Sequence, residues 1–272
     1  MGLSMGRRLQ NPPVYCTLVQ VRFNALLKLG EYLADVQERF RKAGFPAFTQ
    51  GQSVVVRLAW QDDEPAPQPM ARPQYVFGNS QRTHAFVLTS DSLALQSTDY
   101  GTFELFSSTF LKGLASMHEA VELNLTERIG LRYLDHVVPR AGDALEAYLV
   151  PEVLGMGRYL DKLGTLHGQA KYSYSETLGL FGHIQLRSRV LVRDGVAGLP
   201  PDLSPLDLVI PNRFTESPGR HAILDTDGFI EARQDFALEN IERELQATHD
   251  VISAAFKATV SKHALSVWDA RP

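Results

Sequence analysis

Alternating hydrophobic and polar residues predict most of the β-strands of this chain. Between residues 14 and 23, one face of the predicted strand carries Val19, Val21 and Phe23, and the other carries Leu18, Gln20 and Arg22. Similar runs, bounded by glycine, proline, asparagine or serine, predict strands at 53–60, 74–77, 84–89, 93–97, 128–138, 206–210 and 221–230. A long hairpin is predicted from 165–176 and 183–193, with its turn near Leu178 and Gly179.

Hydrophobic residues that recur every three or four positions predict the helices. Helices are expected at 25–42, 102–121 and 236–262, and a shorter one, interrupted by Pro151, at 143–154. The hydrophobic side of the last helix comprises Leu238, Ile241, Leu245, Ile252, Phe256 and Val260. Asp235 is its expected N-cap.

The order of these elements predicts an α+β fold in which antiparallel sheet is covered by helices and closed by a long C-terminal helix. The proline-rich acidic stretch 61–73 is expected to be a loop between strands. Residues 1–10 are expected to be disordered. The remainder divides into two pseudo-similar α+β halves, 11–140 and 141–272, within one compact unit. A tandem ferredoxin-like or helix-grip-like arrangement fits this order.

Composition narrows the class of protein. The 272 residues are 44% hydrophobic and 21% charged, which is typical of a globular protein, and the net charge of −4 disfavours bulk binding to nucleic acid or a membrane surface. No apolar run is long enough to cross a membrane. Cys16 is the single cysteine, so a reducing, cytoplasmic location is expected, with Cys16 buried in a strand.

The predicted hairpin carries the most prominent set of polar residues. His167, Gln169 and Lys171 share a face of its first strand, and His183, Gln185, Arg187 and Arg189 share a face of its second. Antiparallel pairing would bring these faces side by side. Such a surface can bind a phosphate or a nucleic-acid backbone through arginine, or it can be the solvated face of a sheet packed on one side.

Two further sets of charged residues have alternative interpretations. Asp225 and Asp227 share a strand face, where they can ligate a metal ion or form ion pairs with Arg132, Arg187 or Arg189. The alternation around Arg132 predicts partial burial, which calls for a carboxylate partner, and an anion-binding role is the alternative. No metalloprotease, paired-cysteine, serine-hydrolase or phosphate-loop motif occurs, so no cofactor is expected.

Several segments, taken in order, resemble a sporadically distributed family of uncharacterised bacterial proteins. They are Asn11-Pro12-Pro13 with Val19-Gln20-Val21-Arg22-Phe23, then Arg128-Ile129-Gly130-Leu131-Arg132-Tyr133, Leu224-Asp225-Thr226-Asp227, and His249, Phe256 and Thr259 on the last helix. Ala247-Thr248 stands where the family more often has leucine. The resemblance implies no activity. It suggests the setting of a mobile bacterial defence or toxin–antitoxin locus.

Three functional hypotheses follow. The first is a non-enzymatic protein that binds a protein partner or forms a homodimer. The second is a nucleic-acid-binding or nucleic-acid-processing protein that uses the hairpin face. The third is a metal-dependent phosphodiesterase that uses Asp225 and Asp227. His249 lies close to the hydrophobic side of the last helix and is expected to be a packing residue.

Overall fold

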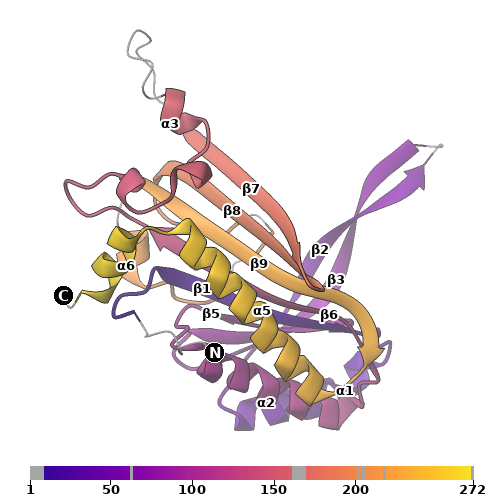
Figure 1. Cartoon of the computed structure of the whole chain (residues 1–272). Helices are drawn as coiled ribbons and strands as arrows, with labels where there is room; N and C mark the ends of the chain where they lie inside the picture. The colour runs from indigo at the N-terminus through magenta and orange to yellow at the C-terminus, as the bar shows by residue number, and fades with distance from the viewer. Residues whose placement is uncertain are drawn as a thin grey trace.

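The computed structural model describes residues 9–61, 64–160, 170–200, 202–203, 206–216 and 219–270. The strands are β1 (Val14–Phe23), β2 (Ala47–Gln61), β3 (Glu64–Gly78), β4 (His84–Thr89), β5 (Ser92–Ser97), β6 (Leu125–Val137), β7 (Tyr172–Phe181), β8 (Ile184–Gly195) and β9 (Gly219–Asp235). Within these residues they form one antiparallel sheet in the order β2-β3-β4-β5-β1-β6-β9-β8-β7 (Figure 1). The prediction of an α+β fold built on antiparallel sheet is confirmed.

The helices are α1 (Leu29–Lys42), α2 (Phe103–Val121), α3 (Gly157–Leu160), α4 (Asn212–Thr215), α5 (Leu238–Thr259) and α6 (Lys262–Asp269), with two 3₁₀ helices, η1 (Leu145–Ala147) and η2 (Pro151–Val153). No helix in the described ranges is long and apolar enough to span a membrane.

The three long helices pack on one side of the sheet, which we call the helix face. Helix α5 runs diagonally across β9, β6 and β8, and α2 and α1 pack on β5 and β3 (Figure 1). The main hydrophobic core lies between these layers and includes Val21, Phe40, Phe110 and Leu245. Burial of this apolar surface is the principal force that holds α5 against the sheet.

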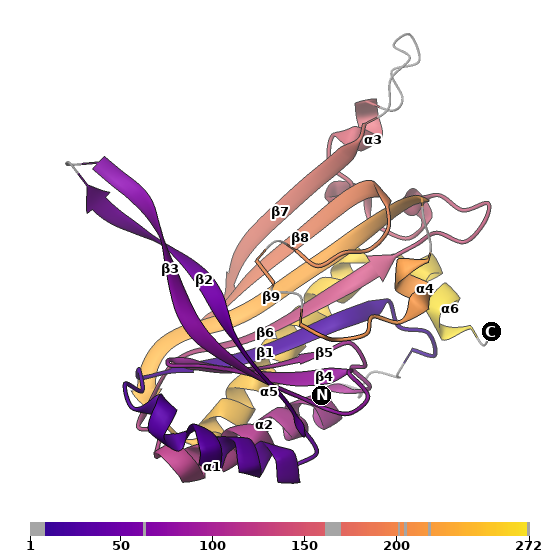
Figure 2. The ribbon, with the colours of Figure 1, turned by 180° about the vertical axis from the view of Figure 1, so that it is seen from behind.

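The opposite side of the sheet, which we call the cap face, is partly covered by the segment between β8 and β9 (Figure 2). This segment, the cap, comprises residues 196–200, 202–203 and 206–216, and includes α4. A small core forms where Phe214 of the cap meets Tyr15, Leu134 and Ile223 of the sheet. A register shift between Val14 and Cys16 accompanies this packing, and both Tyr15 and Cys16 belong to the same small core.

The sheet is continuous across the boundary that the sequence suggested between the halves 11–140 and 141–272. Strand β6 of the first half pairs with β9 of the second over its whole length. Each half therefore supplies part of a single layer.

The expected loop at 61–73 is wrong for most of its length, because β3 begins at Glu64. The prolines of β3 all stand at odd-numbered positions, 65, 67, 69 and 73. In an antiparallel strand their missing N–H groups fall on one edge, and β4 pairs with β3 only from Tyr75 onward. Prolines on that uncovered edge leave the pairing with β2 intact.

Several predicted boundaries also differ. The hairpin turn lies at Gly182-His183, where Gly182 has a φ of +64°, and not at Leu178-Gly179. The predicted strand at 206–210 is irregular backbone within the cap, and the predicted helix at 143–154 is replaced by η1 and η2.

The C-terminal helix is also shorter than predicted. It begins after Ala237, without a side-chain cap from Asp235, and ends before Val260. The chain is extended at Val260, and Ser261 then caps α6 by accepting a hydrogen bond from the backbone N–H of Ala264.

Candidate functional site

The cap face contains a buried cluster of charged side chains on three adjacent strands. Arg132 on β6 donates two hydrogen bonds to Asp225 on β9, from Nε to Oδ1 and from Nη2 to Oδ2, both at 2.7 Å. Arg189 on β8 reaches Asp225 Oδ2 at 2.8 Å. The side chains of Arg132 and Asp225 are each 8% exposed. Both oxygens of Asp225 therefore accept from guanidinium groups, an arrangement that neutralises a buried charge.

The cap supplies the fourth member of this cluster. Asp202 accepts hydrogen bonds from Arg132 Nη1 at 2.6 Å and Nη2 at 3.2 Å. Burial opposes the charge of Arg132, but its bonds to Asp225 and Asp202 raise its pKa on balance. The bond from Arg132 in turn lowers the pKa of Asp202. Tyr15 also holds the cap, because its hydroxyl donates to the backbone oxygen of Gly198 at 2.7 Å.

Asp227 lies two residues after Asp225 on β9 and on the same face, but its surroundings differ from those of Asp225. Its register partners are Arg132 and Arg187, yet its nearest cation is Arg128, at 3.6 Å. Burial raises the pKa of Asp227 despite the positive charges of Arg128 and Arg132. Among the residues that the structure describes, no group of three or more metal-ligating side chains comes together. With Asp225 saturated by arginine, this geometry does not favour the predicted metal pair.

The other predicted residues of the hairpin separate in space. His167 lies outside the described residues, and Lys171 is exposed just before β7 begins. His183 is in the turn, where its Nε2 lies 2.7 Å from the carboxylate of Glu244 on α5. Arg187 and Arg189 do share the cap face, and Arg187 is 3.3 Å from Glu176. The predicted cationic face is therefore divided, and its two arginines are ion-paired.

The side chains of β7 that lie beside Arg187 and Arg189 are mostly hydrophobic, whereas the sequence predicted the polar residues His167, Gln169 and Lys171 there. The turn at Gly182 sets the register so that the even-numbered residues of β7 lie beside the arginines of β8. Tyr172, Tyr174, Leu178 and Leu180 are 69%, 49%, 60% and 69% exposed. The sequence signal for this surface is the alternation from Tyr172 to Leu180, together with the glycine at 182.

A buried histidine pair lies beneath the cap. The rings of His136 and His221 are 4.6 Å apart, and His136 also contacts the rings of Tyr15 and Phe214. Neither ring nitrogen of His136 has a hydrogen-bond partner in the described structure. Burial, and then the neighbouring His221, lower the pKa of His136 to about 4. This pair packs as neutral rings.

On the helix face, His249 is a packing residue. Its ring stacks on Phe103 with centroids 4.1 Å apart, and its Nδ1 lies 3.1 Å from the hydroxyl of Tyr133. Tyr133 is also hydrogen-bonded to Tyr100. Nearby in the chain, Asp135 is buried without a side-chain partner among the described residues, and burial raises its pKa to about 7.

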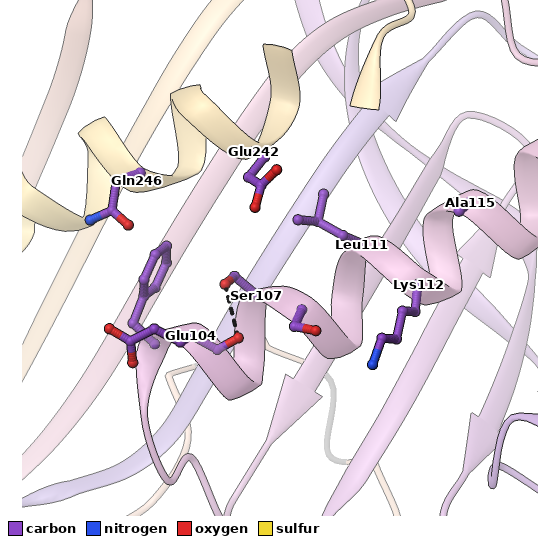
Figure 3. Close-up of a pocket in the computed structure, with 9 residues that line it drawn as sticks. Glu104, Ser107, Leu111, Lys112, Ala115, Glu242 and Gln246 are labelled. Carbon is purple, nitrogen blue, oxygen red and sulfur yellow. Dashed lines mark hydrogen bonds between the residues drawn. The ribbon is translucent and has the colours of Figure 1, made fainter. Parts of the chain in front are cut away.

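A groove of about 430 Å³ lies between α2 and α5 (Figure 3). Phe103, Leu111 and Ala115 supply its apolar lining, and Ser107 is hydrogen-bonded to the backbone oxygen of Glu104. Its charged and amide residues, Glu104, Lys112, Glu242 and Gln246, are all exposed. An open groove without a buried polar group gives little specificity, so it is the weaker candidate site.

Comparison with known proteins adds no family assignment, since no family model and no curated protein matches the chain.

Proposed function

We propose that this chain is a non-enzymatic protein-binding module whose contact surface is β7 together with α3. The observation that carries this proposal is a concentration of exposed hydrophobic side chains. Eight of the fourteen large hydrophobic residues that are most exposed in the described structure lie between positions 156 and 181. They are Met156, Tyr159, Leu160, Tyr172, Tyr174, Leu178, Leu180 and Phe181. Exposed hydrophobic side chains gathered around one strand in this way are typical of a protein interface.

The backbone of β7 supports the same proposal. Strand β7 is the last strand of the sheet among the described residues and pairs there only with β8, so no residue that the structure describes pairs with the N–H and C=O groups of its outer edge. Exposed edges are commonly protected by lysine, proline or a bulge. The ten residues of β7 contain no lysine or proline, and their register with β8 is uninterrupted. An unprotected edge with apolar side chains favours addition of a strand from another protein.

The nucleic-acid hypothesis has less support from this surface. Nucleic-acid binding draws on cations that are free to contact phosphates. Arg187 is ion-paired with Glu176, and Arg189 with Asp225. The resemblance of the sequence to a bacterial family suggests a defence or toxin–antitoxin locus as the setting. A protein encoded beside this chain would then be the first partner to test.

Cross-linking in cells of the organism that encodes the chain tests the proposal. The variant Leu178→Glu/Leu180→Glu places two charges on the β7 surface, and Leu105→Glu, at an exposed position on α2, is the matched control. We expect cross-links between this chain and other protein molecules to fall about tenfold in the double variant, a change of roughly 1.4 kcal/mol, and to persist in the control. Equal cross-linking in all three proteins would refute a binding role for β7.

A mobility-shift assay with short RNA and DNA at two salt concentrations tests the alternative. Binding at low salt that disappears in Arg187→Glu/Arg189→Glu and persists in Leu178→Glu/Leu180→Glu would favour the nucleic-acid hypothesis.

A further inference from the structure

Resting on the proposed function, we infer that the protein that docks on β7 is a second copy of this chain. The two β7 strands pair antiparallel about a two-fold axis that is perpendicular to the sheet and passes midway between Glu176 and its copy. Strand addition of this kind joins the two sheets edge to edge into one continuous layer. Two-fold pairing of identical surfaces is the commonest symmetry among soluble homo-oligomers.

The sequence of β7 is self-complementary about Glu176. A perpendicular two-fold axis keeps the cap faces of both copies on the same side, so residues at equal distances from Glu176 meet. Tyr174 then lies opposite Leu178 of the second copy, and Tyr172 lies opposite Leu180 of the second copy. With both directions counted, four tyrosine–leucine pairs form, and aromatic–aliphatic pairs directly across two strands stabilise an antiparallel sheet.

The charges at the centre of this arrangement are balanced. A two-fold axis midway between the two copies of Glu176 places their carboxylates opposite each other, which is unfavourable when they are unpaired. Each Glu176 is, however, 3.3 Å from Arg187 of its own chain and is the register partner of Arg189. At the centre of the interface, the Arg187 guanidinium of each chain therefore offsets the carboxylate of Glu176.

The same pairing also brings together the exposed apolar residues at the ends of β7. Phe181 is 52% exposed and points to the helix face, on the same side as Ser173. Gly157 of α3 packs against Ser173, so α3 lies beside the start of β7. Antiparallel pairing brings Phe181 of the second copy to this end of β7, where the exposed Tyr159 of α3 and Met156, just before α3, also lie.

Sedimentation of the full chain across about 1 to 100 μM is the first measurement. We expect a dimer that becomes a monomer in Leu178→Glu/Leu180→Glu and remains a dimer in Leu105→Glu. Circular dichroism and thermal unfolding of the double variant show whether it is still folded. Because both leucines are more than half exposed, we expect the fold to be retained.

Disulfide formation tests the position of the axis. Cys16 is buried and is the only cysteine, so oxidation reports on an introduced thiol alone. Glu176→Cys places the two thiols directly opposite each other and should give a covalent dimer on mild oxidation. Tyr172→Cys is the control, because its copy lies eight residues along the strand, about 27 Å away, beyond disulfide reach.

The outcomes separate this inference from the proposed function. A dimer that dissociates in the double variant and cross-links through Glu176→Cys supports both. A monomer at every concentration, or a dimer that survives in the double variant, overturns the inference of a second copy. If the monomeric protein still loses a different cross-linked partner in the double variant, the proposed function stands without it.

Discussion

Arg132 and Asp225 form a bidentate ion pair in which both N–O distances are 2.7 Å and both side chains are buried. The pair joins β6 of the first half of the chain to β9 of the second. Through Asp202 it also attaches the cap to the sheet. It thus joins both halves of the chain and the cap, and these ion pairs account for the burial of its charges.

The first prediction concerns this ion pair. Asp225→Asn leaves Arg132 and Arg189 facing a neutral group in a buried site, and the free energy of unfolding should fall by about 3 kcal/mol. Urea unfolding measures the change. Asp207→Asn is the control, because its exposed pair with Arg82 should contribute no more than about 1 kcal/mol. Equal stability of wild type and Asp225→Asn would show that the cluster is dispensable for folding.

The second prediction concerns Asp135, whose pKa is raised to about 7 by burial. An unfolded aspartate has a pKa near 3.9, so between about pH 4 and pH 7 the folded chain keeps a proton that the unfolded chain loses. Asp135 therefore lowers stability as the pH rises through this window. Asp135→Asn should be more stable than wild type at pH 8, and the difference should shrink toward pH 4. A pH-independent difference in urea midpoints would contradict this assignment.

The third prediction has the opposite sign. The pKa of His136 is about 4, well below the value of about 6.5 in an unfolded chain. The unfolded chain binds the extra proton between these values, so the stabilising effect is complete above about pH 6.5 and is lost as the pH falls to 4. His136→Phe, which keeps an aromatic ring beside Tyr15 and Phe214, should lose less stability on acidification. Equally steep loss of stability in wild type and His136→Phe between pH 6.5 and pH 4 would contradict this prediction.

The fourth prediction compares two helical glycines. A Cβ atom at Gly113 on α2 would lie 2.3 Å from Cζ of the buried Phe86, so Gly113→Ala should destabilise the protein by about 1–3 kcal/mol. A Cβ at Gly30 on α1 meets nothing within 4 Å. Gly30→Ala should therefore stabilise the protein by about 0.5–1 kcal/mol through helix propensity alone. Thermal unfolding that shifts in the same direction for both variants would contradict the packing argument.

Periodicity along the chain was sufficient to predict the fold class and most of the elements. Strands β1 and β4 and helix α2 lie close to their predicted ranges, because each is more buried on one face and so repeats its hydrophobic residues at a regular spacing. Strand β6 also lies close to its predicted range, although most of it is buried on both faces. The prolines of β3 led to the wrong prediction of a loop at 61–73. A strand tolerates proline on an edge with no neighbouring strand, and periodicity does not reveal which edge that is.

The candidate site was only partly predictable. The sequence identified Arg132, Asp225 and Arg189 as charged residues in strands, and it suggested their ion pairing. Asp202 was not predicted, because it comes from an irregular segment about 70 residues from Arg132 and has no periodic pattern. The apolar surface of β7 was not predicted, because the turn was expected near Leu178 and the predicted strand therefore ended at residue 176, halfway along β7.

The amino-acid sequence by itself determined most of the strands and helices, because local periodicity reflects burial on one face. The tertiary structure decided how those segments pair. The register of β7, β8 and β9 depends on the turn at Gly182 and on contacts between distant strands, and a shift of one residue moves every side chain to the opposite face. The local sequence pattern does not specify this register. The register places Arg189 against Asp225 and leaves Tyr172 and Leu180 exposed at the edge of the sheet.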